Sequence, residues 1–98
     1  GVEGGSFDGT WHVRLVTQSG TCDSSYSQMV AIENGRVRPV GGAAAISGGV
    51  GSDGRVALTI AQSVATADAQ GRLRSKAGSG SWNLPMLGCT GSWTARRA

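Results

Sequence analysis

Apolar and polar residues alternate with a period of two along much of the chain, the pattern of β-strands with one buried face. The first run places Trp11, Val13 and Leu15 on one face, with polar residues between them. The second run, 26–32, has the same spacing and ends at Asn34-Gly35. An Asn-Gly pair between two alternating runs strongly favours a tight hairpin turn. The pattern therefore predicts consecutive antiparallel strands from the start of the chain.

Eight such runs follow one another, separated by short links rich in Gly, Ser, Asn or Asp. They cover residues 10–16, 26–32, 36–40, 44–50, 56–61, 64–73, 79–84 and 90–96. The sixth run alternates Ala with polar residues and could also suit a short helix. Short links favour an up-and-down meander, and eight strands are enough to close a sheet around an interior that side chains fill or that holds one small ligand. We predict an all-β fold, an eight-stranded barrel, with a two-sheet β-sandwich as the alternative.

The chain has 98 residues, enough for one domain. We expect a flexible N-terminal arm over 1–7 and a single barrel domain over 8–98. Glycine accounts for 17 residues, which disfavours helices and suits many turns. Only 15% of residues are charged and 39% are hydrophobic, which argues against disorder. No apolar run approaches the ~18 residues of a membrane span, and no leader opens the sequence, so we expect any signal peptide to have been removed.

Two cysteines, Cys22 and Cys89, favour one disulfide, the alternative being two separate buried thiols. A bridge implies an oxidising compartment, so we expect a secreted or periplasmic protein. In the predicted barrel the second and eighth strands flank the first, about 9.5 Å apart at ~4.8 Å per strand. A disulfide requires Cα atoms within ~7 Å. Both cysteines must therefore lie in loops that lean over the end of the barrel.

The sequence Gly9-Thr10-Trp11 on the first strand and the basic pair Arg96-Arg97 at the end of the last resemble the calycin pattern of lipocalins, avidins and small bacterial protease inhibitors. The resemblance implies a barrel in which Trp11 closes one end and a basic side chain, from Arg96 or Arg97, lies across it. The chain as a whole is also similar to small secreted bacterial proteins with a G-T-W opening, two cysteines and a terminal C-x-G-x-W-x-A-R-R. No ligand residues of avidins map onto this sequence.

Basic residues gather toward one end of the predicted meander, where the turns near 33–35, 51–54 and 74–79 also lie. We expect a basic rim, and a positively charged mouth, made by Arg36, Arg38, Arg55, Arg72, Arg74, Lys76, Arg96 and Arg97. The rim is either a solvated face or a contact for an anionic surface. The net charge of +3 is modest, and no nucleic-acid partner is expected.

Aromatic residues are the main candidates for a binding site inside the barrel. Trp11 and Trp93 fall on adjacent strands of a closed barrel and could stack as core. Alternatively, Trp11, Tyr26, Trp82 and Trp93 line a ligand pocket, in which Tyr26 supplies a polar group.

The sequence contains only partial matches to catalytic and cofactor-binding motifs. His12, the one histidine, shares the outward face of its strand and lacks companion ligands, since Met29 is expected at the surface. The string Gly49-x-Gly51-x-x-Gly54 precedes a strand rather than the helix that a dinucleotide fingerprint requires. Asp8, Asp23 and Asp53 adjoin Gly or Ser, as turn residues do. We therefore expect no enzyme activity, cofactor or metal.

These observations favour a non-enzymatic binding module. It is either a carrier of a small apolar ligand or a protein-binding module such as a protease inhibitor. A structural or self-assembling surface protein is the alternative. Partner identity and oligomeric state stay open.

Overall fold

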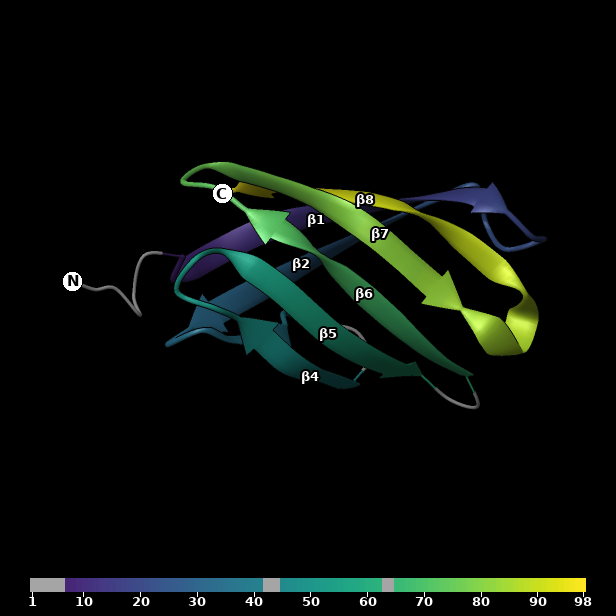
Figure 1. The fold of residues 1–98 in the computed structure, drawn as a ribbon, viewed down its shortest axis with the longest axis horizontal. Helices are drawn as coiled ribbons and strands as arrows, with labels where there is room; N and C mark the ends of the chain where they lie inside the picture. The colour runs from purple at the N-terminus through teal and green to yellow at the C-terminus, as the bar shows by residue number, and fades with distance from the viewer. Residues whose placement is uncertain (1–6, 42–44, 63–64) are drawn as a thin grey trace.

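A computed structural model describes residues 7–41, 45–62 and 65–98 of the chain. Its eight strands form one closed antiparallel barrel in sequence order (Figure 1). They are β1 (Gly9–Ser19), β2 (Ser25–Glu33), β3 (Arg36–Pro39), β4 (Ala45–Val50), β5 (Arg55–Gln62), β6 (Ala65–Leu73), β7 (Ala77–Leu84) and β8 (Cys89–Arg97). A short 3-10 turn, η1 (Pro85–Leu87), precedes β8.

The barrel closes where β8 pairs with β1, placing Val13 opposite Ala95 and Leu15 opposite Trp93. The predicted meander and barrel are thus confirmed, and the alternative of a two-sheet sandwich is wrong. The short helix considered for the sixth run is also wrong, because β6 pairs with β5 from Ala65 to Arg72. Among the described residues, none belongs to a helix long and apolar enough to cross a bilayer.

The tight turn between β2 and β3 follows from its sequence. Asn34 and Gly35 have φ angles of 53° and 80°, the left-handed region that a two-residue hairpin of this kind requires. Asparagine and glycine adopt this conformation at little cost. The turn fixes the register in which Glu33 lies opposite Arg36.

The barrel wall is least complete at β3, which has only four residues and therefore few pairs with its neighbouring strands. Its pairing with β4 is the single Cα pair Arg36↔Gly49, and its pairing with β2 ends at Val30↔Pro39. The outer half of β2, which carries Tyr26 and Gln28, therefore has β1 as its one paired neighbour among the described strands.

A disulfide joins Cys22 to Cys89 with a Cα–Cα distance of 6.2 Å. Cys22 lies in the β1–β2 loop, as expected, but the expectation that both cysteines lie in loops is wrong, because Cys89 is the first residue of β8. The end of β1 accommodates this geometry. Its pairing with β8 shifts register between Thr17 and Ser19. Gly20, with a φ of 102°, passes so close to Cys89 that a Cβ there would lie 2.8 Å from the Cys89 Cα.

The tightly packed core fills the barrel end at which β1 starts and β8 finishes. Its inward side chains are almost completely buried: Trp11, Ile32, Val37, Val56, Leu73 and Ala95. Phe7, expected to end the flexible arm, packs against this core, whereas 1–6 lies outside the described residues. We call this the closed end of the barrel and the opposite end, with the disulfide, the mouth.

Candidate functional site

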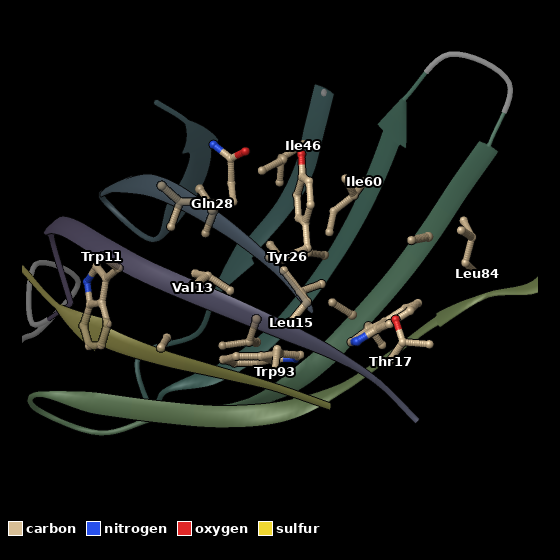
Figure 2. Close-up of a pocket in the computed structure, with 18 of the residues that line it drawn as sticks. Trp11, Val13, Leu15, Thr17, Tyr26, Gln28, Ile46, Ile60, Leu84 and Trp93 are labelled. Carbon is tan, nitrogen blue, oxygen red and sulfur yellow. The ribbon is translucent and has the colours of Figure 1, made fainter. Parts of the chain in front are cut away.

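The barrel encloses a cavity of about 470 Å³ (Figure 2). This volume lies within the ~300–1,000 Å³ range of small-molecule sites. Inward-facing side chains of all eight strands line the cavity, and most of them are aliphatic or aromatic. They include Val13, Leu15, Ile46, Leu58, Ile60, Ala65, Ala67, Trp82, Leu84 and Trp93. Several of these apolar side chains, such as Ile46 and Ile60, are only half-buried because they face this hollow interior.

Trp11 and Arg97 seal the closed end. The guanidinium carbon of Arg97 lies 4.8 Å from the centroid of the Trp11 ring, within the range of a cation–π interaction. Arg97 also donates from Nη1 to the Asp8 carbonyl at 2.6 Å and from Nε to the Ser75 carbonyl at 3.0 Å. The Trp11 indole donates to the Phe7 carbonyl at 2.9 Å. These bonds hold the side chains of Trp11 and Arg97 across the closed end of the barrel. The calycin resemblance implies this position for Arg96 or Arg97, and Arg97 occupies it.

Trp82 and Trp93 lie flat against the wall instead of filling the interior. Each belongs to a Gly-Ser-Trp sequence, and the β7–β8 register places each tryptophan opposite the glycine of the other sequence: Gly80↔Trp93 and Trp82↔Gly91. A Cβ at Gly80 would lie 2.7 Å from the Trp93 ring, and one at Gly91 would lie 2.7 Å from Trp82 Nε1. Because Gly80 and Gly91 have no side chains, they leave the space in which the rings of Trp93 and Trp82 lie.

The two indole N–H groups stay close to the backbone of neighbouring strands. Trp93 Nε1 lies 3.2 Å from the carbonyl oxygens of both Gln70 and Ser81. Trp82 Nε1 lies 3.2 Å from the Val16 oxygen and 3.1 Å from the Ser92 oxygen. The rings thus extend in opposite directions, Trp93 toward β6 and Trp82 toward β1. Figure 2 shows the Trp93 ring edge-on along the wall.

Alanines on β6, the strand paired with β7, leave space beside the tryptophans. Ala65, Ala67 and Ala69 point inward, and Ala67 lies opposite Ile60 of β5. Large side chains that lie flat on one side and small side chains on another leave a hollow interior. This arrangement of tryptophans and alanines explains why side chains do not fill the interior of the eight-stranded barrel.

Polar groups line the mouth rather than the closed end. Tyr26, Thr17, Gln28 and Asp23 contribute to the lining. Tyr26 is 49% exposed, and Figure 2 shows its ring among the side chains that line the cavity. The Gln28 amide donates to the Met29 carbonyl at 2.7 Å. The mouth is therefore the part of the cavity that can hydrogen-bond a ligand.

All four aromatic residues proposed from the sequence line this cavity, and the three tryptophans belong to one buried core. The expected stack of Trp11 on Trp93 is wrong, because β1 residue Leu15, four positions from Trp11, is the partner of Trp93. At ~3.4 Å per residue this offset is about 14 Å. Thr17, Gln28 and the aliphatic lining were not among the predicted site residues, although the period of two places them on the inward faces of their strands.

The basic residues lie at the closed end, so the expectation of a positively charged mouth is wrong. Arg36, Arg38, Arg55, Arg72, Arg74, Lys76 and Arg96 are exposed there, and Arg97 is half-buried on Trp11. The error arose because the sequence gives the end at which charges gather but not the end at which the cavity opens.

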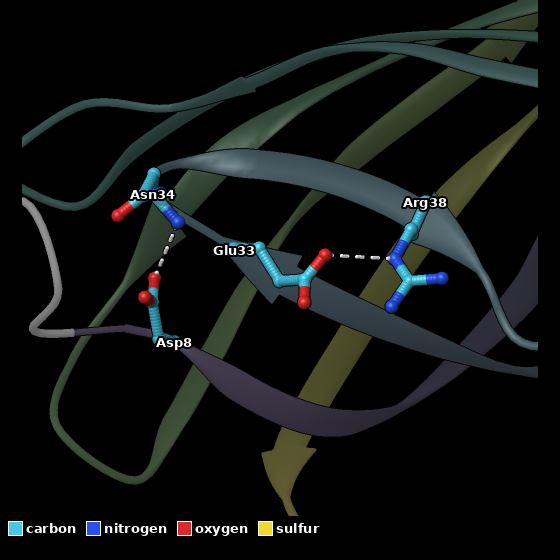
Figure 3. A network of polar contacts seen from close by, with 4 residues as sticks. All are labelled: Asp8, Glu33, Asn34 and Arg38. Carbon is cyan, nitrogen blue, oxygen red and sulfur yellow. Dashed lines mark hydrogen bonds and ion pairs between the residues drawn. The ribbon is translucent and has the colours of Figure 1, made fainter.

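Acidic residues at the closed end serve local turns and one exposed ion pair (Figure 3). Asp8 Oδ1 accepts a hydrogen bond from the Asn34 N–H at 2.9 Å, and Glu33 pairs with Arg38 at 3.1 Å. In the β4–β5 turn, the backbone N–H of Arg55 donates to Asp53 Oδ1 at 3.0 Å. This bond is the main reason why the pKa of Asp53 is lowered from its usual value, and the positive charges of Arg55 and Arg72 lower it further.

The other candidate motifs have structural positions without catalytic geometry. His12 is exposed on the outer face, directly opposite Met29 and Arg96 on the adjacent strands. Within the described ranges, His, Cys, Asp and Glu form no group of three suited to a metal ion. Gly49, Gly51 and Gly54 lie around the β4–β5 turn, and a strand follows them. A comparison of the sequence with protein-family models and with curated proteins found no match.

Proposed function

We propose that this protein is a non-enzymatic binding protein that holds a small apolar ligand in the barrel interior. The observation that supports the proposal is the 470 Å³ cavity, which is lined mainly by apolar side chains and closed at one end by Trp11. An apolar molecule that enters such a cavity leaves water, and that transfer is favourable at about 25 cal/mol per Å². No comparable gain is available to a polar molecule, because hydrogen-bonding groups are confined to the mouth.

The proposal also includes a cellular compartment and a structural family for the protein. The Cys22–Cys89 bridge supports a secreted or periplasmic location, since disulfides persist in oxidising compartments. The Arg97–Trp11 contact supports a calycin-like barrel, because the calycin pattern places a basic residue of the last strand across the first-strand tryptophan.

Fluorescence of N-phenyl-1-naphthylamine, a neutral apolar probe, tests the proposal. Trp82 and Trp93 line the cavity, so saturable quenching of their emission with one probe per barrel is expected. Ala67→Phe places a ring inside the cavity and should weaken probe binding at least ten-fold. Thr66→Phe is the matched control, because Thr66 is exposed on the outer face of the same strand.

Two results would contradict the carrier proposal. Absence of saturable binding, or equal effects of the two substitutions, would mean that the interior is not the site. The protein would then act through its outer surface, as a protein-binding module or a structural protein would.

We also propose a second role for the closed end, as a contact for an anionic surface. Eight of the nine Lys and Arg residues of the chain lie at this end, and seven of them are exposed to solvent there. Co-sedimentation with vesicles of phosphatidylglycerol, compared with phosphatidylcholine, tests this role. Binding to the anionic vesicles that disappears at high salt is expected. Equal binding to both vesicles, or none, would exclude it.

A further inference from the structure

Charge is distributed unevenly along the barrel axis, and the cavity opens at the end opposite the eight clustered basic residues. Of the described residues that line the cavity, none is Lys, Arg or His, and Asp23 is the one with a charged side chain at neutral pH. The basic residue of β1 nearest to the mouth is Arg14, which is exposed on the outer face of the wall. A ligand in the cavity therefore meets a negative charge at the mouth and no positive charge inside.

Asp23 is held at the mouth by bonds on both sides. Its neighbour Cys22 is tied to β8 by the disulfide. The Thr17 hydroxyl donates to the backbone oxygen of Asp23 at 2.5 Å, and the Thr17 N–H donates to the Ser24 oxygen at 3.0 Å. Because these bonds use backbone atoms, the carboxylate of Asp23 keeps its own hydrogen-bonding capacity for a ligand.

The cavity also has a polarity gradient. Its inner part is formed by apolar groups such as Trp11 and Val56, near the closed-end starts of β1 and β5, and its outer part includes the Tyr26 phenol and the Thr17 hydroxyl. An amphiphile therefore fits with its apolar chain inward and its polar head at the mouth. An anionic head in this position would face Asp23 without a cationic partner, and an unpaired charge near an apolar cavity is unfavourable.

We propose that the ligand is a neutral or cationic amphiphile, such as a long-chain alcohol or amine, and that Asp23 selects against carboxylates and phosphates. This inference rests on the proposed carrier function and specifies the chemical class of its ligand. Because Asp23 is exposed to water, its effect is that of a surface ion pair, about five-fold in affinity at low salt.

Displacement of N-phenyl-1-naphthylamine by decylamine, decanol and decanoate at pH 7 tests the ligand class. The three compounds share one chain length and differ in head charge. We expect the ammonium compound to displace the probe at the lowest concentration, the alcohol next and the carboxylate last. High salt should reduce the advantage of the ammonium compound, since exposed charges are screened.

Two variants test the role of Asp23. Asp23→Asn should remove the advantage of decylamine over decanol and reduce the disadvantage of decanoate. Asp68→Asn is the matched control, because Asp68 is an exposed residue of β6, between the inward Ala67 and Ala69, and carries the same charge on the outer face. This control should keep the wild-type order.

The possible outcomes separate the two proposals. If the probe binds but decanoate displaces it as well as decanol does, the proposed ligand class is wrong and the carrier function stands. If Asp23→Asn keeps the preference for decylamine, Asp23 does not select the ligand. If neither the probe nor any decyl compound binds, the carrier function fails and the ligand class with it.

Discussion

The guanidinium carbon of Arg97 lies 4.8 Å from the centroid of the Trp11 ring, joining the last residue of β8 to the third residue of β1. This contact closes one end of the barrel and brings together segments separated by most of the chain. Under the proposed carrier function, a ligand would therefore enter from the opposite end. The stability of the closed end should therefore depend on Arg97 more than on any other exposed or half-exposed basic residue.

Replacing Arg97 with Met should lower the free energy of unfolding by about 1–3 kcal/mol, because the cation–π contact and two hydrogen bonds to carbonyls are lost. Urea denaturation measures the change. Arg96→Met is the matched control, since Arg96 is exposed and lies on the outer face opposite His12. Equal losses in both variants would show that Arg97 does not stabilise the closed end.

Removing the disulfide should destabilise the barrel by about 4 kcal/mol, because the bridge spans a sequence separation of 67 residues and limits the unfolded chain. Cys22→Ala combined with Cys89→Ala tests this, with denaturation followed in the presence and absence of a reductant. The reductant should destabilise the wild-type protein and leave the double variant unchanged. A loss below about 1 kcal/mol would mean that the mouth is held together by strand pairing alone.

Gly91→Ala should displace Trp82 from the wall, since the added Cβ would lie 2.7 Å from Nε1 and would also press on the Val16 carbonyl. Overpacking of this kind costs about 1–3 kcal/mol. The indole N–H resonance of Trp82 should shift in NMR spectra while that of Trp11 stays in place. Gly51→Ala is the control, because its Cβ would meet only the movable Asp53 side chain, at 3.0 Å, and a backbone oxygen at 3.8 Å. An unchanged Trp82 resonance in Gly91→Ala would contradict the proposed role of the glycine.

Asp53 should contribute to acid sensitivity. Its pKa is lowered, chiefly by the hydrogen bond from the Arg55 N–H, so its contribution to stability is present above the usual aspartate pKa of about 3.9 and is lost as pH falls through the lower folded-state value. Asp53→Asn should remove this part of the pH dependence below pH 4. NMR titration of the carboxyl carbon gives the pKa directly, and a value at or above that of Asp in an unfolded peptide would contradict the expectation.

The period of two explains why so much of the fold was predictable. In β1 from Trp11 to Leu15 and in β5 from Val56 to Ala61 the alternation indicated the strands and their inward faces directly, because each inward residue there is apolar and each outward residue is polar or small. At Asn34-Gly35 the turn was readable because two residues with positive φ are needed there. The same parity could have chosen Arg97 over Arg96, since Arg97 shares the inward face of Trp93 and Ala95.

The amino-acid sequence by itself determined the strands, their inward faces, the tight turns and the end at which basic residues gather, because these depend on neighbours in the chain. Only the tertiary structure decided where Trp82, Trp93 and Trp11 lie relative to one another, and at which end the cavity opens. Those properties depend on the register between β8 and β1 and on the space left by Gly80 and Gly91 on paired strands. A register between distant segments is a property of packing, since a shift by one residue would exchange the inner and outer faces without changing any local pattern.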